Sequence, residues 1–201
     1  MHHLLVLFLE LLIISLPSIS GKATQVVYDT EGHELSSHSN YYILPAHHGT
    51  GTGGLLTYGD TRHDCTFFVV QTQNEGDKGI HMGFNPPSDG VVVLSSNVTI
   101  NFHDLTVCQE SLHWYVTNHS PMSSSEHYQY VGMGKGNTVG FPIIPPSVFR
   151  IERYGNASNE YKLVWCSNEK LCKDLGVHAS MGLNFLVTSR SPLAVVFEKA
   201  L

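Results

Sequence analysis

Basic residues are scarce in this sequence. Among its 201 residues, Lys and Arg together number 11, whereas Asp and Glu number 17, and the formal net charge is −6. A nucleic-acid backbone is bound mainly through clusters of Lys and Arg, and too few are present to form such a surface. We therefore expect no nucleic-acid partner.

Long apolar segments are also missing. Leu4–Leu16 is a mainly apolar run interrupted by Glu10, and it falls short of the roughly 20 residues that a membrane-spanning helix needs. Pro17 follows it, and the small residues Ser18 and Ser20 are typical of a secretory signal peptide cleaved after Ser20. We expect a signal peptide at residues 1–20, one domain at residues 21–201, a secreted protein and no membrane partner.

No enzyme or metal motif fits its surroundings. The stretch GTGTGG at 49–54 is not followed by a helical pattern whose N-terminus could bind phosphate. The histidines of HELSSH at 33–38 are five residues apart, whereas a zinc-protease helix needs them four apart. The sequence has no G-x-S-x-G motif, and no pair of carboxylates suggests an active site. We expect no enzyme activity, no cofactor and no metal.

The sequence instead contains many short strand patterns, rich in Val, Ile, Phe, Tyr and Thr and separated by clusters of turn residues. Residues 21–201 show no sustained helical period. The predicted fold class is all-β, with about twelve strands forming a barrel or sandwich. Three groups of four strands would give threefold pseudo-symmetry. The predicted strands are Val26–Asp29, Tyr41–Leu44, Cys65–Gln71, Ile80–Phe84, Val91–Leu94, Val98–Phe102, His113–Thr117, His127–Val131, Val148–Tyr154, Tyr161–Trp165, Asn184–Thr188 and Leu193–Phe197.

The chain has four cysteines, Cys65, Cys108, Cys166 and Cys172. In a secreted chain an even number of cysteines predicts disulfides, here two, and three pairings are possible. The short spacing of Cys166 and Cys172 favours a local bridge, which would leave Cys65 to pair with Cys108. A local bridge stabilises a fold by about 2 kcal/mol, so it would mainly shape its own loop.

Three N-x-S/T sequences are candidate glycosylation sites in a secreted chain. They begin at Asn97, Asn118 and Asn156. Pro121 directly follows the second of them, which makes Asn118 the least favourable acceptor.

Several segments resemble the plant Kunitz family, the soybean-trypsin-inhibitor and miraculin-like proteins. VYDTEGHEL at 27–35, followed after five residues by YYILP at 41–45, resembles the family's N-terminal signature. FFVVQTQNEGDKGI at 67–80, YKLVWC at 161–166 and PLAVVFEKA at 192–200 are similar to its later strands. The resemblance implies a β-trefoil, in which six strands close a barrel and three hairpins cap it.

The resemblance also implies a function and a pairing of cysteines. It supports the bridges Cys65–Cys108 and Cys166–Cys172. Family members hold out a rigid loop that a protease binds as a slowly cleaved substrate, and one side chain, called P1, enters the specificity pocket. We therefore expect a monomeric inhibitor of a protease, of the serine class in preference to the cysteine class, located in the apoplast or the vacuole.

NPPSDG at 85–90 resembles the family's reactive loop, with Ser88, Asp89 and Gly90 at its tip. Trypsin-inhibiting members carry Arg or Lys at P1, where this chain has Asp89. The pocket of trypsin ends in a carboxylate, so a second carboxylate there would be unfavourable. We expect no strong inhibition of trypsin through this loop.

The residues expected to support this loop are Pro86, Pro87 and Ser37. The two prolines stiffen the chain because each fixes its own φ angle. Ser37 stands where the family uses an asparagine to brace the loop, and its side chain is shorter. Weak support and an acidic tip leave open a non-inhibitory binding or storage protein on the same scaffold.

A second candidate site is the disulfide loop Cys166–Asp174, which contains Lys170 and Lys173. A bridge fixes the backbone beside each lysine, so either could enter a pocket that prefers basic residues. Lys173 directly follows Cys172 and is the first choice, and Lys170 is the second.

Overall fold

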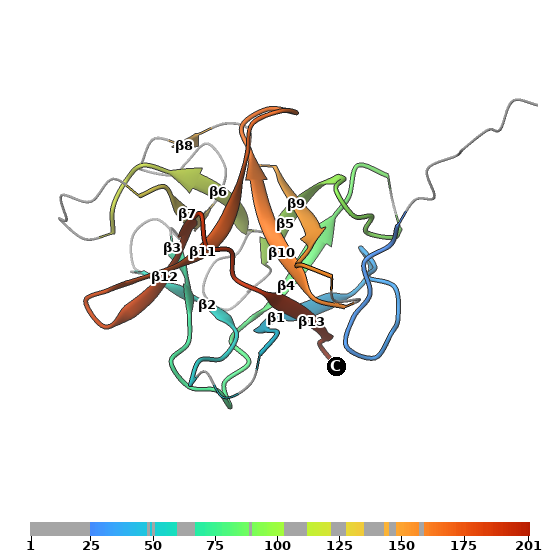
Figure 1. The fold of residues 1–201 in the computed structure, drawn as a ribbon, viewed down its shortest axis with the longest axis horizontal. Helices are drawn as coiled ribbons and strands as arrows, with labels where there is room; N and C mark the ends of the chain where they lie inside the picture. The colour runs from blue at the N-terminus through green and yellow to red at the C-terminus, as the bar shows by residue number, and fades with distance from the viewer. Residues whose placement is uncertain are drawn as a thin grey trace, which may run out of the picture.

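The structure, a computed structural model, consists of β-strands joined by turns, and no helix occurs in the part of the chain that it describes (Figure 1). Among those residues, no helix is long and apolar enough to cross a membrane. The described residues are 25–47, 49, 51–59, 67–88, 90–102, 112–121, 128–134, 143–144, 148–156 and 159–201. The strands are β1 (Asn40–Pro45), β2 (Leu55–Tyr58), β3 (Phe67–Gln71), β4 (His81–Asn85), β5 (Asn97–Phe102), β6 (Leu112–Thr117), β7 (Tyr130–Gly134), β8 (Ile143–Ile144), β9 (Phe149–Arg153), β10 (Tyr161–Cys166), β11 (Cys172–Ser180), β12 (Leu183–Thr188) and β13 (Val195–Lys199).

Six of these strands close a barrel. The antiparallel neighbours run β13, β1, β4, β5, β9 and β10, and β10 pairs again with β13, so the ring is complete. A closed ring leaves no unpaired edge among these strands.

Three hairpins form the cap. β2 pairs with β3, β6 with β7, and β11 with β12. The second strand of each hairpin also pairs with the corresponding strand of the other two, since β3, β7 and β12 contact one another pairwise. Barrel strand, hairpin and barrel strand therefore follow one another three times along the chain. The predicted β-trefoil with threefold pseudo-symmetry is confirmed. The described residues form thirteen strands, one of them the two-residue β8, where about twelve were expected.

The barrel and its cap enclose one large apolar core, in which aromatic rings pack edge to face. The ring centroids of Phe84 and Phe197 are 5.3 Å apart, and those of Trp114 and Phe149 are 5.7 Å apart. All four side chains are essentially buried. Such pairs contribute about 1 kcal/mol beyond the burial of their surface, so the barrel is a firm base for the loops on it.

The N-terminal segment 25–37 lies against residues 90–94. Val27 N donates a hydrogen bond to Val92 O at 3.0 Å, and Val92 N donates to Leu35 O at 2.8 Å. These contacts hold the segment that follows the candidate reactive loop.

Two buried tyrosines tie the same N-terminal segment to the barrel. The Tyr161 hydroxyl accepts a hydrogen bond from Tyr28 N, and the Tyr41 hydroxyl accepts one from Ser36 N, each at 2.9 Å. Their rings lie in the core. The Tyr41 hydroxyl therefore links the core to the backbone next to Ser37, and the Tyr161 hydroxyl links it to the segment at Tyr28.

Two predicted strands were wrong, and two observed strands besides β8 were not predicted. Val26–Asp29 and Val91–Leu94 form only isolated bridges, because they pair with each other and with a turn rather than with a barrel strand. The strands Leu55–Tyr58 and Cys172–Ser180 were not predicted. The second begins with three residues of which two are charged, and it contains Gly176, so its sequence lacks the expected apolar alternation.

Candidate reactive loop and disulfide turn

The loop 85–90 connects the end of β4 to the segment before β5. Ser88 and Pro87 are exposed and Pro86 is half-buried, so the tip faces solvent. Gly90 has a φ angle of +115°, a conformation that residues with a side chain rarely adopt. Asp89 lies outside the described residues, and its role as P1 stays a prediction.

Ser37 holds the C-terminal end of this loop through two hydrogen bonds. Ser37 N donates to Gly90 O at 2.8 Å, and Gly90 N donates to Ser37 Oγ at 3.2 Å. The Ser37 side chain is shorter than an asparagine but still reaches the loop, because the adjoining segment is fixed against the barrel. The sequence identified Ser37, and its contribution to inhibition stays a prediction.

The N-terminal end of the loop is held by an asparagine pair that the sequence analysis did not identify. Asn85 Nδ2 donates to Asn101 Oδ1 at 3.0 Å. Asn101 lies in β5 and is 5% exposed, although it sits between apolar residues. VTINF at 98–102 alternates apolar and polar residues, a pattern that predicts Asn101 on the outer face of a strand, so its burial left no signal in the sequence.

The disulfide turn joins β10 to β11. Cys166 and Cys172 are opposite one another and form the predicted local bridge. Asn168 Oδ1 accepts hydrogen bonds from the backbone N–H groups of Lys170 and Leu171, each at 2.9 Å. Lys170 is exposed at this turn, and Leu171 is 64% exposed, so both are presented to solvent.

Lys173 lies in a strand and not in the loop expected from the sequence. It belongs to β11, where it is opposite Trp165 of β10. Its Nζ donates to Gln129 Oε1 at 2.8 Å. A paired strand residue is less accessible to a protease than a loop residue, so the geometry favours Lys170 over Lys173 as a residue presented by this hairpin.

A half-buried ion-pair group lies beside β11. Lys162 Nζ is 2.7 Å from Asp174 Oδ1 and 3.6 Å from Glu152 Oε2. Burial by itself lowers the pKa of Lys162, but the hydrogen bonds and charges of Asp174 and Glu152 outweigh it and raise this pKa. Lys162 therefore neutralises Asp174 in the wall of the hairpin.

The remaining sequence predictions concern covalent modifications. Asn97, Asn118 and Asn156 are all exposed, which is compatible with glycosylation, and their occupancy stays a prediction. Cys65 and Cys108 lie outside the described residues, so that bridge also stays a prediction. The described residues contain no group of three or more possible metal ligands.

Comparison with known proteins places this geometry in a family. The family model described as "Trypsin and protease inhibitor", of the Kunitz type, matches residues 27–199. The chain is 37% identical to the alpha-amylase/subtilisin inhibitor of Oryza sativa subsp. japonica, covering 96% of this chain and 94% of that protein. It is 34% identical to the alpha-amylase/subtilisin inhibitor of Hordeum vulgare over 87% of this chain and 85% of that protein.

Solved structures agree with the sequence comparison. The rice bifunctional alpha-amylase/subtilisin inhibitor from Oryza sativa superposes with a TM-score of 0.68 at 36% identity, covering 89% of this chain and all of that one. Soybean trypsin inhibitor superposes with a TM-score of 0.69 at 29% identity, covering 88% of this chain and all of that one. The chain therefore belongs to the Kunitz family of trypsin and protease inhibitors.

Proposed function

We propose that this chain is a secreted inhibitor of a serine protease of the subtilisin type, and that the loop 85–90 is its reactive site. The observation that carries the proposal is the support at both ends of the loop. Ser37 holds Gly90 through two hydrogen bonds, and Asn101 holds Asn85 through one. A loop that is fixed before binding loses little conformational freedom in the complex, which favours tight association.

The composition of the loop argues for this class of target. The loop 85–90 contains neither Lys nor Arg, and the preferred P1 candidates are Asp89 and its neighbour Ser88. The specificity pocket of trypsin contains a carboxylate that attracts a basic P1 residue. Three relatives of 33% identity or more, from rice, barley and wheat, are named as subtilisin inhibitors. Both facts support a protease whose pocket does not require a basic side chain.

The test is a set of inhibition constants measured with the purified protein against subtilisin, trypsin, chymotrypsin and papain. We expect inhibition of subtilisin and little inhibition of trypsin. The substitution Asp89→Arg should introduce trypsin inhibition, because the basic side chain would then pair with the carboxylate in the specificity pocket. The matched control Lys170→Ala changes the disulfide turn and should leave both constants unchanged.

Two outcomes would contradict the proposal. If Lys170→Ala abolishes inhibition while Asp89→Arg has no effect, the disulfide turn is the reactive site. If the wild-type protein inhibits no protease in the set and Asp89→Arg does not create inhibition, the chain is a non-inhibitory binding or storage protein on this scaffold.

Inhibition of an alpha-amylase is a second candidate function. The same three cereal relatives carry both activities in their names, and the matches cover 87% or more of this chain. An amylase assay repeated after saturation with subtilisin tests this candidate. Retained amylase inhibition would place the second activity on a surface away from the loop 85–90, and no inhibition in either assay would exclude it.

A further inference from the structure

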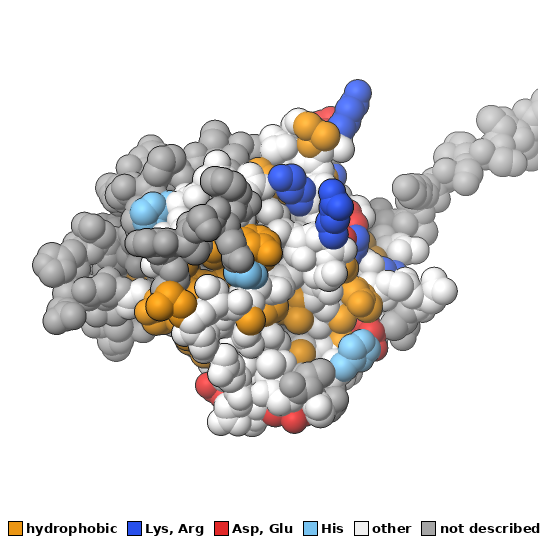
Figure 2. Space-filling model, turned by 60° about the vertical axis from the view of Figure 1, so that its left-hand side comes forward, with side chains coloured by type: hydrophobic (Ala, Val, Ile, Leu, Met, Phe, Trp, Pro, Cys, Tyr) orange, Lys and Arg blue, Asp and Glu red, His pale blue; other side chains and the backbone are white. Residues whose placement is uncertain are grey.

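Basic residues are concentrated in the last quarter of the chain. Residues 148–201 contain seven of the 11 Lys and Arg residues but only five of the 17 Asp and Glu residues. Figure 2 shows several Lys and Arg side chains gathered on one face of the molecule. An acidic chain therefore carries a locally basic region built from the third strand group.

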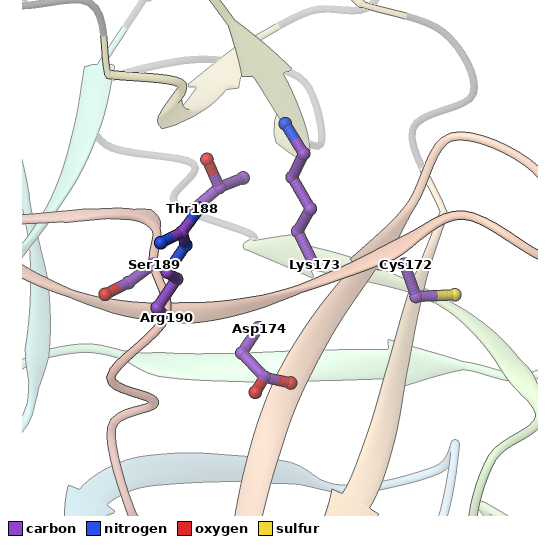
Figure 3. Close-up of a pocket in the computed structure, with 6 residues that line it drawn as sticks. All are labelled: Cys172, Lys173, Asp174, Thr188, Ser189 and Arg190. Carbon is purple, nitrogen blue, oxygen red and sulfur yellow. The ribbon is translucent and has the colours of Figure 1, made fainter.

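A hollow of about 530 Å³ opens in this region. One wall is the start of β11, and the other is the end of β12 with the turn that follows it (Figure 3). Its volume falls within the range of roughly 300–1,000 Å³ that is usual for small-molecule sites. The described residues that line it are Cys172, Lys173, Asp174, Thr188, Ser189 and Arg190.

The backbone around the hollow is fixed. Ser189 N donates to Asp174 O at 2.8 Å, so the turn that carries Arg190 is tied directly to β11. A Cβ atom at Gly176 would lie 2.2 Å from Ser191 O, which shows how closely this turn packs on the strand. The separation of the two walls is therefore set by the fold before any ligand binds.

The charges in the hollow are arranged for an anion. Lys173 Nζ is oriented by Gln129 Oε1 at 2.8 Å, and the Thr188 hydroxyl contacts the same oxygen at 3.3 Å. Asp174 is bound to Lys162 at 2.7 Å, and in Figure 3 its carboxylate points away from Lys173 and Arg190. Among the ion pairs of the described residues, none involves Lys173 or Arg190.

The lining of the hollow favours a small ligand over a protein. Interfaces between proteins are enriched in buried aromatic side chains, Met and Arg. Among the described residues lining the hollow, only Arg190 is of that kind, and no aromatic side chain is present. Cations beside hydroxyl groups are instead suited to a ligand that has both an anionic group and hydroxyls.

We propose that this hollow binds an anionic sugar, meaning a sugar unit that carries a carboxylate or a phosphate. Lys173 and Arg190 bind the anionic group, and the hydroxyl of Thr188 contacts a hydroxyl of the sugar. The site is separate from the loop 85–90 in the fold, because it is built on the β11–β12 hairpin and not on the β4–β5 connection.

Calorimetric titration of the full purified protein tests the proposal, with trigalacturonate and glucose 6-phosphate as probes. The neutral sugar maltotriose and a tetraglutamate peptide are the controls. We expect binding of at least one anionic sugar, weaker binding at higher salt, and none of maltotriose. Lys173→Gln and Arg190→Gln should each weaken binding about tenfold, since each removes one charge-assisted hydrogen bond.

Lys170→Gln is the matched control, because Lys170 is an exposed lysine on the adjoining turn that does not line the hollow. It should bind as the wild type does, and equal melting temperatures would show that all variants are folded. The probe that binds more tightly identifies uronate or phosphate as the source of the anionic group. No binding of either sugar, equal loss in Lys170→Gln, or preference for tetraglutamate would overturn the proposal.

Discussion

Ser37 and Gly90 are 53 positions apart in the sequence and exchange two hydrogen bonds, one through backbone atoms and one through the Ser37 hydroxyl. The backbone contact fixes where the loop ends, and the hydroxyl fixes the orientation of the Gly90 peptide group. Because Gly90 ends the loop 85–90, this pair connects the loop to the N-terminal segment and, through it, to the barrel.

Replacing Ser37→Ala should weaken protease inhibition without unfolding the protein. The backbone bond from Ser37 N to Gly90 O remains, while the bond to Oγ is lost. We expect the inhibition constant to rise about fivefold, because one such hydrogen bond contributes about 1 kcal/mol. The control is Ser39→Ala, whose hydroxyl makes no hydrogen bond with the described residues. An unchanged constant for Ser37→Ala would show that the hydroxyl does not support the loop.

Gly90→Ala should destabilise the loop through its backbone alone. The φ angle of Gly90 is +115°, and a Cβ atom there would meet nothing within 4 Å. A residue with a side chain is strained in this conformation by roughly 1–3 kcal/mol. Urea unfolding and inhibition assays should both show a loss. If the variant is as stable and inhibitory as the wild type, the positive φ angle is not required.

Gly54→Ala should be strongly destabilising, whereas Gly76→Ala should be tolerated. A Cβ atom at Gly54 would lie 2.0 Å from Lys78 O, but at Gly76 its nearest neighbour would be Asn74 Oδ1 at 3.6 Å. Overpacking against a backbone atom costs about 1–3 kcal/mol, or more where the backbone cannot move. Melting temperatures of the two variants provide the comparison. Similar values would mean that the backbone at Lys78 shifts easily.

Tyr115→Phe should change how stability depends on alkaline pH. The Tyr115 hydroxyl is buried without a hydrogen-bond partner among the described residues, and burial raises its pKa. The unfolded chain releases this proton near pH 10, whereas the folded protein retains it, so the free energy of unfolding falls as pH rises above about 10. Lys162, whose folded pKa is also raised, acts in the same direction.

Removing the Tyr115 hydroxyl should therefore make the loss of stability at alkaline pH less steep. At pH 7 the change should be small or stabilising by about 1 kcal/mol, since an unsatisfied buried hydroxyl is removed. Urea unfolding between pH 7 and pH 11 measures both effects. Tyr58→Phe is the control, because that side chain is 42% exposed. Equal pH profiles for wild type and Tyr115→Phe would show that Tyr115 does not contribute to alkaline unfolding.

The sequence by itself determined the fold class, most of the strands and the local disulfide. Strands and turns leave local patterns, because alternate side chains point to opposite faces and turns need Gly, Pro, Asn or Asp. The Cys166–Cys172 bridge could also be predicted locally, because its two cysteines are separated by six positions in the sequence. The threefold arrangement came from the resemblance of segments such as 27–35 to a known family, since the repeats do not share an obvious sequence.

Only the tertiary structure decided which residues support and surround the candidate sites. Pairing of the N-terminal segment with residues 91–93 brings Ser37 to Gly90, and the pairing of β4 with β5 brings Asn85 to Asn101. Lys173 was assigned to a loop because a strand that begins with charged residues gives no apolar pattern, although its partners in the sheet stabilise it. No sequence pattern around Arg190 indicated that it would lie across the hollow from Lys173. Contacts between distant segments depend on how the whole chain packs, and no short stretch of sequence records that.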